Sequence, residues 1–578
     1  MSHGVNRLRS QIDRTFFLDI LVLTLVMAVG LCLYGVPVLF TPDEGRYAEI
    51  AREMLVNHQY LVPHVDGVTY FEKPPLIYWL TALSLKLFGL NDWAARLVNP
   101  LLSTLGILLT YIICRLVLQK RRLALWSALI SGTSLLYLGV ARYLNLDAGV
   151  SFLITATMLS FWASEQYDRR QYQSYLWLVA AFIFSGLSVM TKGLIGIVFP
   201  MMIIGLWAMV VGRWRLLIDL RLYFGLVIVA LISVPWIIAV NHRYPEFFYY
   251  YVIVQQILRY ITDEQGRQMS KLIYIGIFII GFFPWFGFLP QAFKNVLGKW
   301  KVRKKYSSEW FLLIWGLAIL LFFGFSQSIL IGYLMPIIVP FAILIAKYLD
   351  GVVERDVLTK AGKASFAVVL WLFIILAIGF IILPFIPRFS VYFDEIAAYY
   401  WPAAVVAFVI AMFGFSCLKK QRIRPLMLSF VIAMIILVNL AWSGAQYFSQ
   451  KTVKPLTAVI EPILKAYPET TVANYGGYFY DAQFYLNRLT WIVANEGELA
   501  NTAKMANSGA NKTLRTAKVF WPIWNSPKRI LLLTDKNNYQ HYFVSGKEKG
   551  ILLAKTPKRY LISNQALSYA LLAKWHQR

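Results

Sequence analysis

Residues 365–383 read SFAVVLWLFIILAIGFIIL, a run without a single charged side chain. A helix of about twenty apolar residues is long enough to cross the roughly 30 Å hydrocarbon layer of a bilayer. Similar runs recur along the chain, about thirteen in all. They begin near Phe16, Ala94, Leu123, Gly149, Tyr175, Gly193, Tyr223, Leu272, Trp310, Leu330, Ser365, Trp401 and Pro425. The sequence therefore predicts an α-helical polytopic membrane protein with about thirteen transmembrane helices.

The composition supports a membrane protein and excludes two other classes. Of the 578 residues, 59% are hydrophobic and 15% are charged, and the mean hydropathy is +0.59, which excludes a water-soluble globule. The net charge of +27 is spread over short loops between the apolar runs, so no nucleic-acid groove is predicted. The three cysteines, Cys32, Cys114 and Cys417, form neither a CxxC pair nor a disulfide framework.

The charged loops predict how the chain crosses the membrane. Basic residues cluster in alternate loops, near residues 115–122, 169–170, 213–221, 294–305, 347–363 and 419–424. Because Lys and Arg accumulate in cytoplasmic loops, the N-terminus is predicted to be cytoplasmic and the first apolar run to be an uncleaved span. An odd number of spans then places the end of the chain on the opposite, outer side.

The last part of the chain differs in composition from the rest. Strand-like runs at residues 470–475, 490–494 and 530–534 alternate with helical segments. We therefore predict a transmembrane domain of residues 1–445 followed by a small outer α/β domain of residues 446–578.

The loop after the first span gathers carboxylates. Thr41-Pro42-Asp43-Glu44 predicts a helix start, with Thr41 as N-cap and Glu44 completing a capping box. The helix is predicted to be amphipathic and to lie along the membrane surface. In one interpretation the acids only complement the helix dipole. In the other, Asp43 is a general base or charge stabiliser at the membrane boundary, with Arg46 and Tyr47 on its side of the helix.

Lys73 and Asp147 also allow both a structural and a functional interpretation. Lys73 precedes two prolines and an apolar segment, residues 76–88, which is predicted to be interfacial or re-entrant because it is too short to span. Its ammonium group is suited to binding a phosphate, and equally to snorkelling toward lipid headgroups. Asp147 precedes the fourth span, and its position alone favours helix capping over a role in a site.

Three segments of the first outer loop carry a resemblance to a known family. They are residues 42–54 (PDEGRYAEIAREM), 61–64 (LVPH) and 70–74 (YFEKP). This ordered pattern resembles the first periplasmic loop of the bacterial aminoarabinose transferase family. That family belongs to the GT-C superfamily of polyprenyl-phosphate-sugar-dependent glycosyltransferases, which includes the protein O-mannosyltransferases. The resemblance implies a GT-C fold with interfacial helices in the first outer loop.

The resemblance also implies roles for individual residues. Asp43 and Asp147 match the two acids of the family's catalytic site. The residues expected around the donor phosphate are Lys73, Lys192, Arg259 and Arg46, and those expected to line the cavity are Tyr47, Tyr70, Glu72 and Tyr333. Gln256 stands where the family often has a histidine, so no cofactor is assigned and a divalent metal at Glu72 is left open.

The activity implied by the resemblance is an inverting transfer of a sugar, 4-amino-4-deoxy-L-arabinose, from undecaprenyl phosphate. The acceptor would be lipid A or another envelope molecule at the periplasmic face of the bacterial inner membrane. Transfer to protein or another glycan is the alternative within this class. A lipid or sugar transporter is less well supported, because the acids gather in outer loops and no half of the sequence repeats. A structural scaffold with an outer binding domain is a third class.

Overall fold

The computed structural model describes residues 14–258, 260, 270–326, 330–355, 357–387, 390–448, 451–495, 497–505, 508–546 and 548–567. The chain forms two compact units. Unit 1 comprises Met1–Tyr34, Val98–Ile238 and Tyr249–Gly444, and unit 2 comprises Gly35–Leu97, Ala239–Phe248 and Ala445–Arg578. The predicted domain division at residue 445 stays a prediction.

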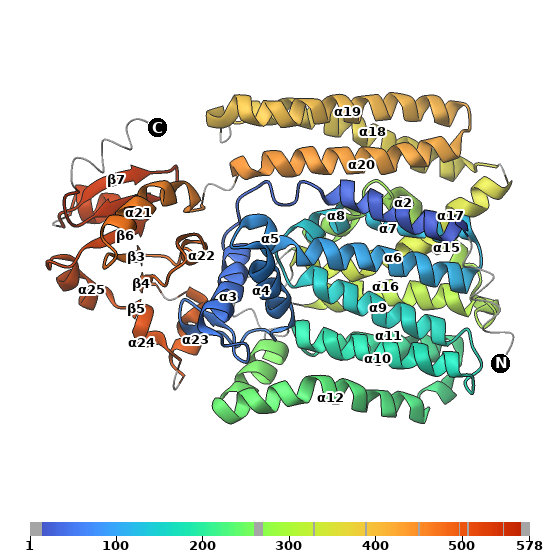
Figure 1. Cartoon of the computed structure of the whole chain (residues 1–578). Coiled ribbons are helices and arrows are strands. Elements are labelled where there is room, and N and C mark those ends of the chain that lie inside the picture. Colours follow the sequence, from blue (N-terminus) through green and yellow to red (C-terminus); the bar gives the residue numbers. More distant parts are fainter. Residues whose placement is uncertain are drawn as a thin grey trace. The chain divides into compact units, whose positions relative to one another are not determined.

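Unit 1 is a bundle of helices, most of them long and lying side by side (Figure 1). In chain order these are α2 (Arg14–Leu31), α6 (Val98–Leu118), α7 (Arg121–Gly132), α8 (Leu135–Arg142), α9 (Asp147–Ser164), α10 (Tyr172–Lys192), α11 (Ile195–Val211), α12 (Leu220–Arg243), α14 (Lys271–Gly281), α15 (Leu289–Leu297), α16 (Ser307–Phe325), α17 (Ile338–Arg355), α18 (Lys360–Ile382), α19 (Phe393–Lys419) and α20 (Ile423–Ala445). Two irregular helical segments, η2 (Tyr249–Leu258) and η5 (Ile331–Ile337), belong to the same unit.

The polytopic helical architecture is confirmed, whereas the count of about thirteen spans is not. Among the described residues, nine helices are long and apolar enough to cross a membrane. Two bent pairs, α7 with α8 at 58° and α14 with the segment Phe286–Leu297 at 100°, raise the number to eleven. The other two expected spans fall on α9 and α11, which do not meet this length and hydropathy standard.

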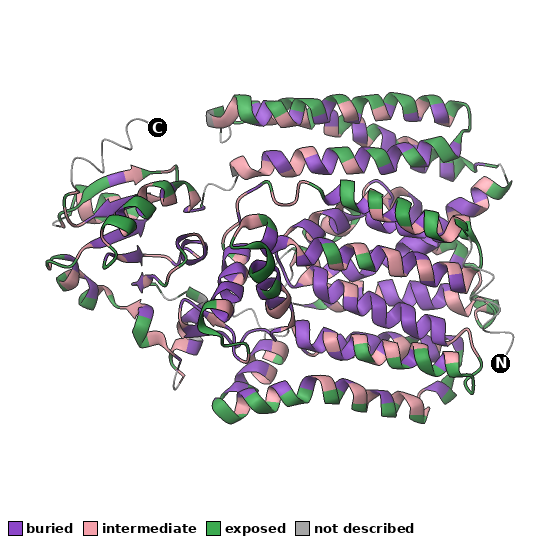
Figure 2. Ribbon diagram, in the orientation of Figure 1, coloured by how far each residue is buried: buried purple, intermediate pink, exposed green. Residues whose placement is uncertain are grey.

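Burial separates central helices from peripheral ones. In the span formed by η5 and α17, 72% of the apolar window is buried within the protein, whereas in α12 the share is only 28%. Figure 2 shows the same contrast, with exposed residues along much of α12 and α19. The exposed residues of α12 include Phe224 and Leu231, at 71% and 70% exposure. Large apolar side chains are stable at such positions only when lipid covers them, as expected for the outer face of a membrane bundle.

Unit 2 contains a six-stranded sheet in the order β5-β4-β3-β6-β8-β7. The strands are β3 (Thr471–Tyr475), β4 (Trp491–Val493), β5 (Leu514–Arg515), β6 (Ile530–Thr534), β7 (Ile551–Lys555) and β8 (Tyr560–Ser563). The first four pair in parallel, and β8 and β7 join antiparallel. The three strands predicted from sequence are β3, β4 and β6, the buried centre of the sheet. The two-residue β5, the more exposed β7 and the four-residue β8 were not predicted.

The loop that follows α2 folds as part of unit 2. It contains α3 (Asp43–Asn57), a two-stranded hairpin of β1 (His64–Val65) and β2 (Val68–Thr69), α4 (Leu76–Phe88) and α5 (Asp92–Arg96). The predicted start of α3 near Asp43 and the short apolar α4 are both observed. The packing of α3 requires glycine at position 45, because a Cβ there would lie 2.8 Å from the backbone nitrogen of Asp481. Helix α3 therefore packs directly against the backbone that precedes α22 (Ala482–Leu486).

The polar face of α3 is buried against the C-terminal part of the chain. Glu49 and Arg52 form a two-pronged ion pair at 2.7 Å, and Arg52 also donates to the side chain of Asn487 at 3.1 Å. Glu53 accepts a hydrogen bond from the backbone N–H of Gly67. The amphipathic pattern thus marks two packing faces, one apolar and one polar, because the polar face finds its partners within the helix, in the β1–β2 turn and at Asn487.

Asp66, in the turn of the β1–β2 hairpin, continues this buried polar contact. Its carboxylate accepts hydrogen bonds from the backbone N–H of Thr490 at 2.8 Å and from the side-chain amide of Gln483 at 3.1 Å. Burial raises the pKa of Asp66 from its usual 3.8 to about 8. The side chain is therefore largely protonated at neutral pH, which avoids a buried negative charge.

Candidate functional site

The start of α3 differs from the predicted capping box. The N-cap is Pro42, and no side chain caps the helix. Instead, the backbone N–H of Phe40 donates to the Glu44 carboxylate at 2.7 Å. The predicted N-cap role of Thr41 is therefore wrong. The physical reason is that the Glu44 carboxylate is held by a buried arginine and satisfies the backbone from that fixed position.

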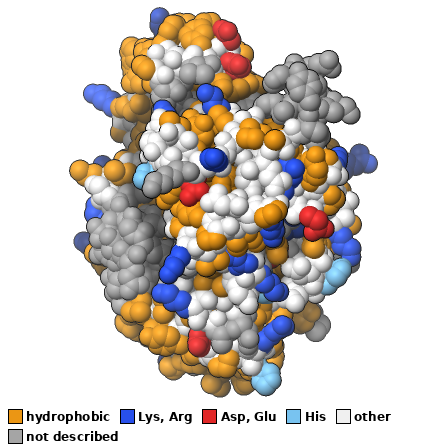
Figure 3. Space-filling view, turned by 90° about the vertical axis from the view of Figure 1, so that its left-hand side faces the viewer, with side chains coloured by type: hydrophobic (Ala, Val, Ile, Leu, Met, Phe, Trp, Pro, Cys, Tyr) orange, Lys and Arg blue, Asp and Glu red, His pale blue; other side chains and the backbone are white. Residues whose placement is uncertain are grey.

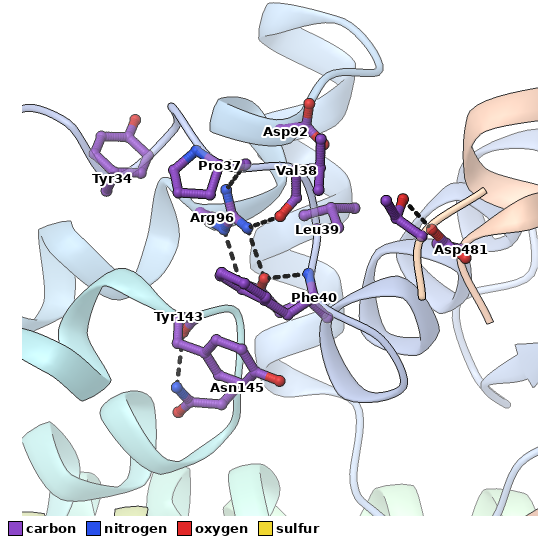
Figure 4. Close-up of polar contacts among 12 residues, drawn as sticks. Tyr34, Pro37, Val38, Leu39, Phe40, Asp92, Arg96, Tyr143, Asn145 and Asp481 are labelled. Carbon is purple, nitrogen blue, oxygen red and sulfur yellow. Dashed lines mark hydrogen bonds and ion pairs between the residues drawn. The ribbon is translucent and has the colours of Figure 1, made fainter. Parts of the chain in front are cut away.

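That arginine is Arg96, at the end of α5. Its guanidinium donates to both carboxylate oxygens of Glu44, at 2.7 and 2.6 Å, and both side chains are fully buried. It also donates to the carbonyl oxygens of Pro37 and Val38, at 2.6 and 2.9 Å. Figure 4 shows Arg96 at the centre of this group. The ion pair thereby fixes residues 37–40, the segment that leads into α3 and so positions Asp43.

Asp43 lies at the first position of α3 and pairs with Arg46 at 2.5 Å. The two side chains differ in accessibility, since 38% of the Asp43 side chain is exposed but only 4% of the Arg46 side chain. The Arg46 guanidinium lies 5.0 Å from the ring centroid of Tyr47, 5.9 Å from that of Tyr70 and 5.7 Å from that of Tyr480. A cation held among aromatic rings and a carboxylate stays charged and oriented despite its burial.

Glu72 and Lys73, which follow the β1–β2 hairpin in the chain, belong to the same group of predicted site residues. The hydroxyl of Tyr70 donates to Glu72 at 3.2 Å, and burial keeps the pKa of Tyr70 well above its usual value, so it remains a donor. Glu72 and Lys73 are both buried, at 8% and 9% exposure. For Lys73, this burial does not fit a side chain extended into lipid headgroups, the alternative interpretation of its position.

A second group of predicted residues comes together in unit 1. Asp147, the first residue of α9, forms an ion pair with Lys192, the last residue of α10. The Lys192 ammonium lies 4.0 Å from the ring centroid of Tyr333, in η5. The Asp147 and Lys192 side chains are 13% and 10% exposed. Consecutive antiparallel helices bring the start of one next to the end of the other, which accounts for the pairing.

Two neighbours of Asp147 explain its orientation. The predicted capping role belongs instead to Asn145, whose side-chain oxygen accepts the backbone N–H of Ala148 at 2.8 Å. Asp147 is therefore available for Lys192. Gly332 lies against the carboxylate, and a Cβ at this position would overlap it, coming within 2.7 Å of the Asp147 Cγ. Only glycine at position 332 allows η5 to approach this ion pair so closely.

Gln256 lies beside the same group. The backbone N–H of Leu194 donates to its side-chain oxygen at 3.3 Å, and a Cβ on Gly193 would overlap its amide. This neutral amide therefore supports the turn that follows Lys192. Among the described residues, no three His, Cys, Asp or Glu side chains are grouped closely enough to hold a metal ion. No such group therefore surrounds Glu72 among these residues.

The predicted site residues thus form two groups, each with an acid paired to a cation. Unit 2 holds Asp43, Arg46, Tyr47, Tyr70, Glu72 and Lys73, and unit 1 holds Asp147, Lys192, Tyr333 and Gln256. Arg259 lies outside the described residues. Sequence reasoning missed Arg96, Tyr480 and Gly332, because each acts through a neighbour distant in sequence and no local pattern marks it.

The sequence of this chain is similar to those of several arabinosyl transferases. The undecaprenyl phosphate-α-4-amino-4-deoxy-L-arabinose arabinosyl transferase of Aeromonas salmonicida is 33% identical to this chain over 418 residues, which cover 71% of the chain and 73% of the relative. The chain belongs to this arabinosyl transferase family. The family member from Erwinia tasmaniensis is 36% identical over 330 residues. In that alignment the chain spans 58% of the relative's length.

Solved structures match the fold of this chain, and a second family model matches part of its sequence. The crystal structure of the arabinosyl transferase ArnT from Cupriavidus metallidurans, bound to undecaprenyl phosphate, matches with a TM-score of 0.81 over 95% of this chain and 98% of that chain, at 24% identity. The same protein without ligand matches with a TM-score of 0.80. The family described as dolichyl-phosphate-mannose-protein mannosyltransferase matches residues 20–251. The GT-C fold expected for the arabinosyl transferase family is thereby confirmed, and the chain is a multi-pass membrane protein.

Proposed function

We propose that this protein transfers 4-amino-4-deoxy-L-arabinose from undecaprenyl phosphate to lipid A. The observation that carries the proposal is its membership of the arabinosyl transferase family, whose members are named for this donor. In the reaction, an acceptor oxygen attacks the anomeric carbon as the bond from that carbon to the donor phosphate breaks. The configuration inverts in this single displacement, and undecaprenyl phosphate leaves without a covalent sugar–enzyme intermediate.

The cations of the two groups are proposed to stabilise the departing phosphate. Lys192 is supported by its geometry, because Asp147 and the ring of Tyr333 hold its ammonium group in place. Arg46 is held in the same way by Asp43 and three tyrosine rings. Fixed positive charge aimed at a developing phosphate charge needs no reorganisation during reaction, and loss of one such donor typically costs about 3 kcal/mol of transition-state stabilisation. We assign Lys73 and Arg259 to the same role.

Asp43 is proposed to act on the acceptor. Its partial exposure supports this role, because it is the more accessible partner of its ion pair. With a hydroxyl acceptor it would take the proton as a general base. With an already ionised phosphate acceptor, little proton removal is needed and Asp43 would orient the acceptor through Arg46. Tyr47, Tyr70 and Glu72 are proposed to line the acceptor and sugar site.

The proposed topology places the N-terminus in the cytoplasm and transfer at the periplasmic face of the inner membrane. Support comes from the alternating basic loops of the sequence. One such loop, residues 165–171, joins the ends of α9 and α10 that lie opposite Asp147 and Lys192. In this topology, the acid–lysine pair faces the periplasm.

Mass spectrometry of lipid A tests the function. Cells that lack their own transferase but make the lipid-linked sugar would express the wild type, Asp147→Asn or Asp350→Asn. The last is a matched control, since Asp350 is also ion-paired in unit 1, with Arg122. We expect the aminoarabinose mass increment with the wild type and the control, and its loss with Asp147→Asn.

The second candidate is transfer to protein, which the mannosyltransferase match over residues 20–251 favours. No mass change on lipid A, together with sugar-modified membrane proteins, would replace the proposal with this candidate.

A further inference from the structure

An apolar groove lies in unit 1 between α9, α10, α11 and the start of α12. Its volume is about 150 Å³, and almost all of its lining is hydrocarbon. The floor is buried and includes Phe161 and Leu178, whereas Met201 and Tyr223 at the rim are 56% and 54% exposed. The groove therefore opens on the outside of the helix bundle.

This groove is too apolar to be filled by ordered water. A buried water needs two to four polar partners, and an unfilled groove would lose dispersion contacts along its walls. On the scale where one water takes about 10–15 Å³, the groove has room for roughly ten groups of that size. The lining of α11 runs from Ile197 to Gly205, about 12 Å of helix. These dimensions fit a stretch of about ten methylenes of one lipid chain.

The loops at one end of the groove carry excess positive charge. Residues 165–171 and 213–221 hold five arginines and three acids, and Leu217 of the second loop lines the groove. Arg169 and Arg221 share the single carboxylate of Asp219. Arg170 and Arg215 are exposed, and the ion pairs of these loops are formed by Arg169, Arg213 and Arg221. A phosphate at this end would meet arginines that the protein itself does not neutralise.

We propose that the groove holds one acyl chain of an anionic glycerophospholipid, with the lipid phosphate bound by the arginines of the two loops. The site is distinct from the groups proposed for sugar transfer. Asp147 begins α9 and Lys192 ends α10, whereas these loops adjoin the opposite ends of the same two helices. The bound lipid is thus a structural partner of the bundle and is not the sugar donor.

A glycine in the groove offers a way to fill it. A Cβ added at Gly205 meets no atom within 4 Å, so the side chain of Gly205→Leu can begin without a clash and enter the space of the lipid chain. Gly379, in α18, is exposed and likewise has open space around a Cβ, and it does not line the groove. Gly379→Leu is therefore the matched control for a larger side chain in a membrane helix.

Native mass spectrometry of the full chain released from nanodiscs tests the proposal. The nanodiscs would contain equal amounts of phosphatidylglycerol and phosphatidylethanolamine, with a trace of undecaprenyl phosphate. We expect one retained phosphatidylglycerol on the wild type and on Gly379→Leu, and about tenfold less on Gly205→Leu. Equal retention of the two phospholipids, or displacement of the bound lipid by undecaprenyl phosphate, would overturn the proposal.

A second pair of variants tests the charge independently of the groove. Arg170→Gln with Arg215→Gln should lower phosphatidylglycerol retention by about tenfold, because charge-assisted contacts to the phosphate are lost. Lys419→Gln with Arg424→Gln, at the exposed end of α19 and start of α20, should leave it unchanged. If both double variants behave alike, the lipid is held by general surface charge and the specific site is rejected. This comparison decides the question even if Gly205→Leu does not fold.

Discussion

Substitution of Arg96 by Met tests whether the buried ion pair with Glu44 holds the start of α3. Met matches much of the volume of the arginine stem but removes its charge and all its donors. Glu44 would then be a buried carboxylate without its cation, and the carbonyl oxygens of Pro37 and Val38 would lose their donors. The variant therefore removes the buried ion pair and its hydrogen bonds, and it leaves the proposed site residues unchanged.

The structure gives the magnitude of this effect. Both side chains are fully buried, and breaking one partner of such a pair costs about 3–5 kcal/mol. We expect Arg96→Met to lower the free energy of unfolding by about 4 kcal/mol, the middle of that range. Glu44→Gln keeps an acceptor for the guanidinium and should cost about 2 kcal/mol. The double variant should cost less than the sum of these two, because no uncompensated carboxylate remains.

The assay is reversible unfolding in mixed detergent micelles, followed by tryptophan fluorescence, for the wild type, both single variants and the double variant. The reasoning predicts a coupling energy above about 1 kcal/mol between the two positions. It is refuted if Arg96→Met unfolds within about 0.5 kcal/mol of the wild type, the ordinary range of a surface substitution. Strict additivity in the double variant would also contradict it.

Three further predictions concern smaller changes. Gly332→Ala should reduce turnover about 10- to 100-fold with little loss of stability, because its Cβ displaces Asp147 from Lys192; wild-type turnover would contradict this. Gly45→Ala should lower the free energy of unfolding by about 1–3 kcal/mol, since its Cβ meets the backbone of Asp481. In the folded protein Asp66 keeps its proton up to about pH 8, whereas in the unfolded chain it ionises near pH 4, so stability should fall as pH rises between these values. Asp66→Asn should flatten that slope in pH-dependent unfolding, and an unchanged slope would exclude Asp66 as its source.

The membrane architecture could be predicted because it depends on local composition. Every expected span falls on a helix, and the central strands β3, β4 and β6 were visible as buried apolar runs. The number of spans could not be fixed, because α9 and α11 fall short of the standard for a span, and α7 with α8 and α14 with α15 are bent pairs. Runs of apolar residues reveal that a segment is buried in lipid or protein, but not whether it continues straight.

The site could be predicted in part. The pairing of Asp147 with Lys192 follows from the order of consecutive helices, whereas the capping by Asn145 that leaves Asp147 available depends on local backbone geometry. The burial of Glu49, Arg52 and Glu53 could not be foreseen, because their environment is supplied by residues such as Asn487 and Gly67 that no local periodicity identifies. Amphipathic spacing shows that a helix has two faces, but it does not show which residues pack against each face.

The central claim is that this chain transfers a sugar from a polyprenyl phosphate with Lys192 as a phosphate-stabilising cation. The most direct measurement is single-turnover release of undecaprenyl phosphate by the purified protein, supplied with the aminoarabinose-linked donor and lipid A. We predict release with the wild type and a loss of about 100- to 1,000-fold with Lys192→Met, for a variant that unfolds like the wild type. Release at the wild-type rate by Lys192→Met, or an intact donor with the wild type, would contradict the account.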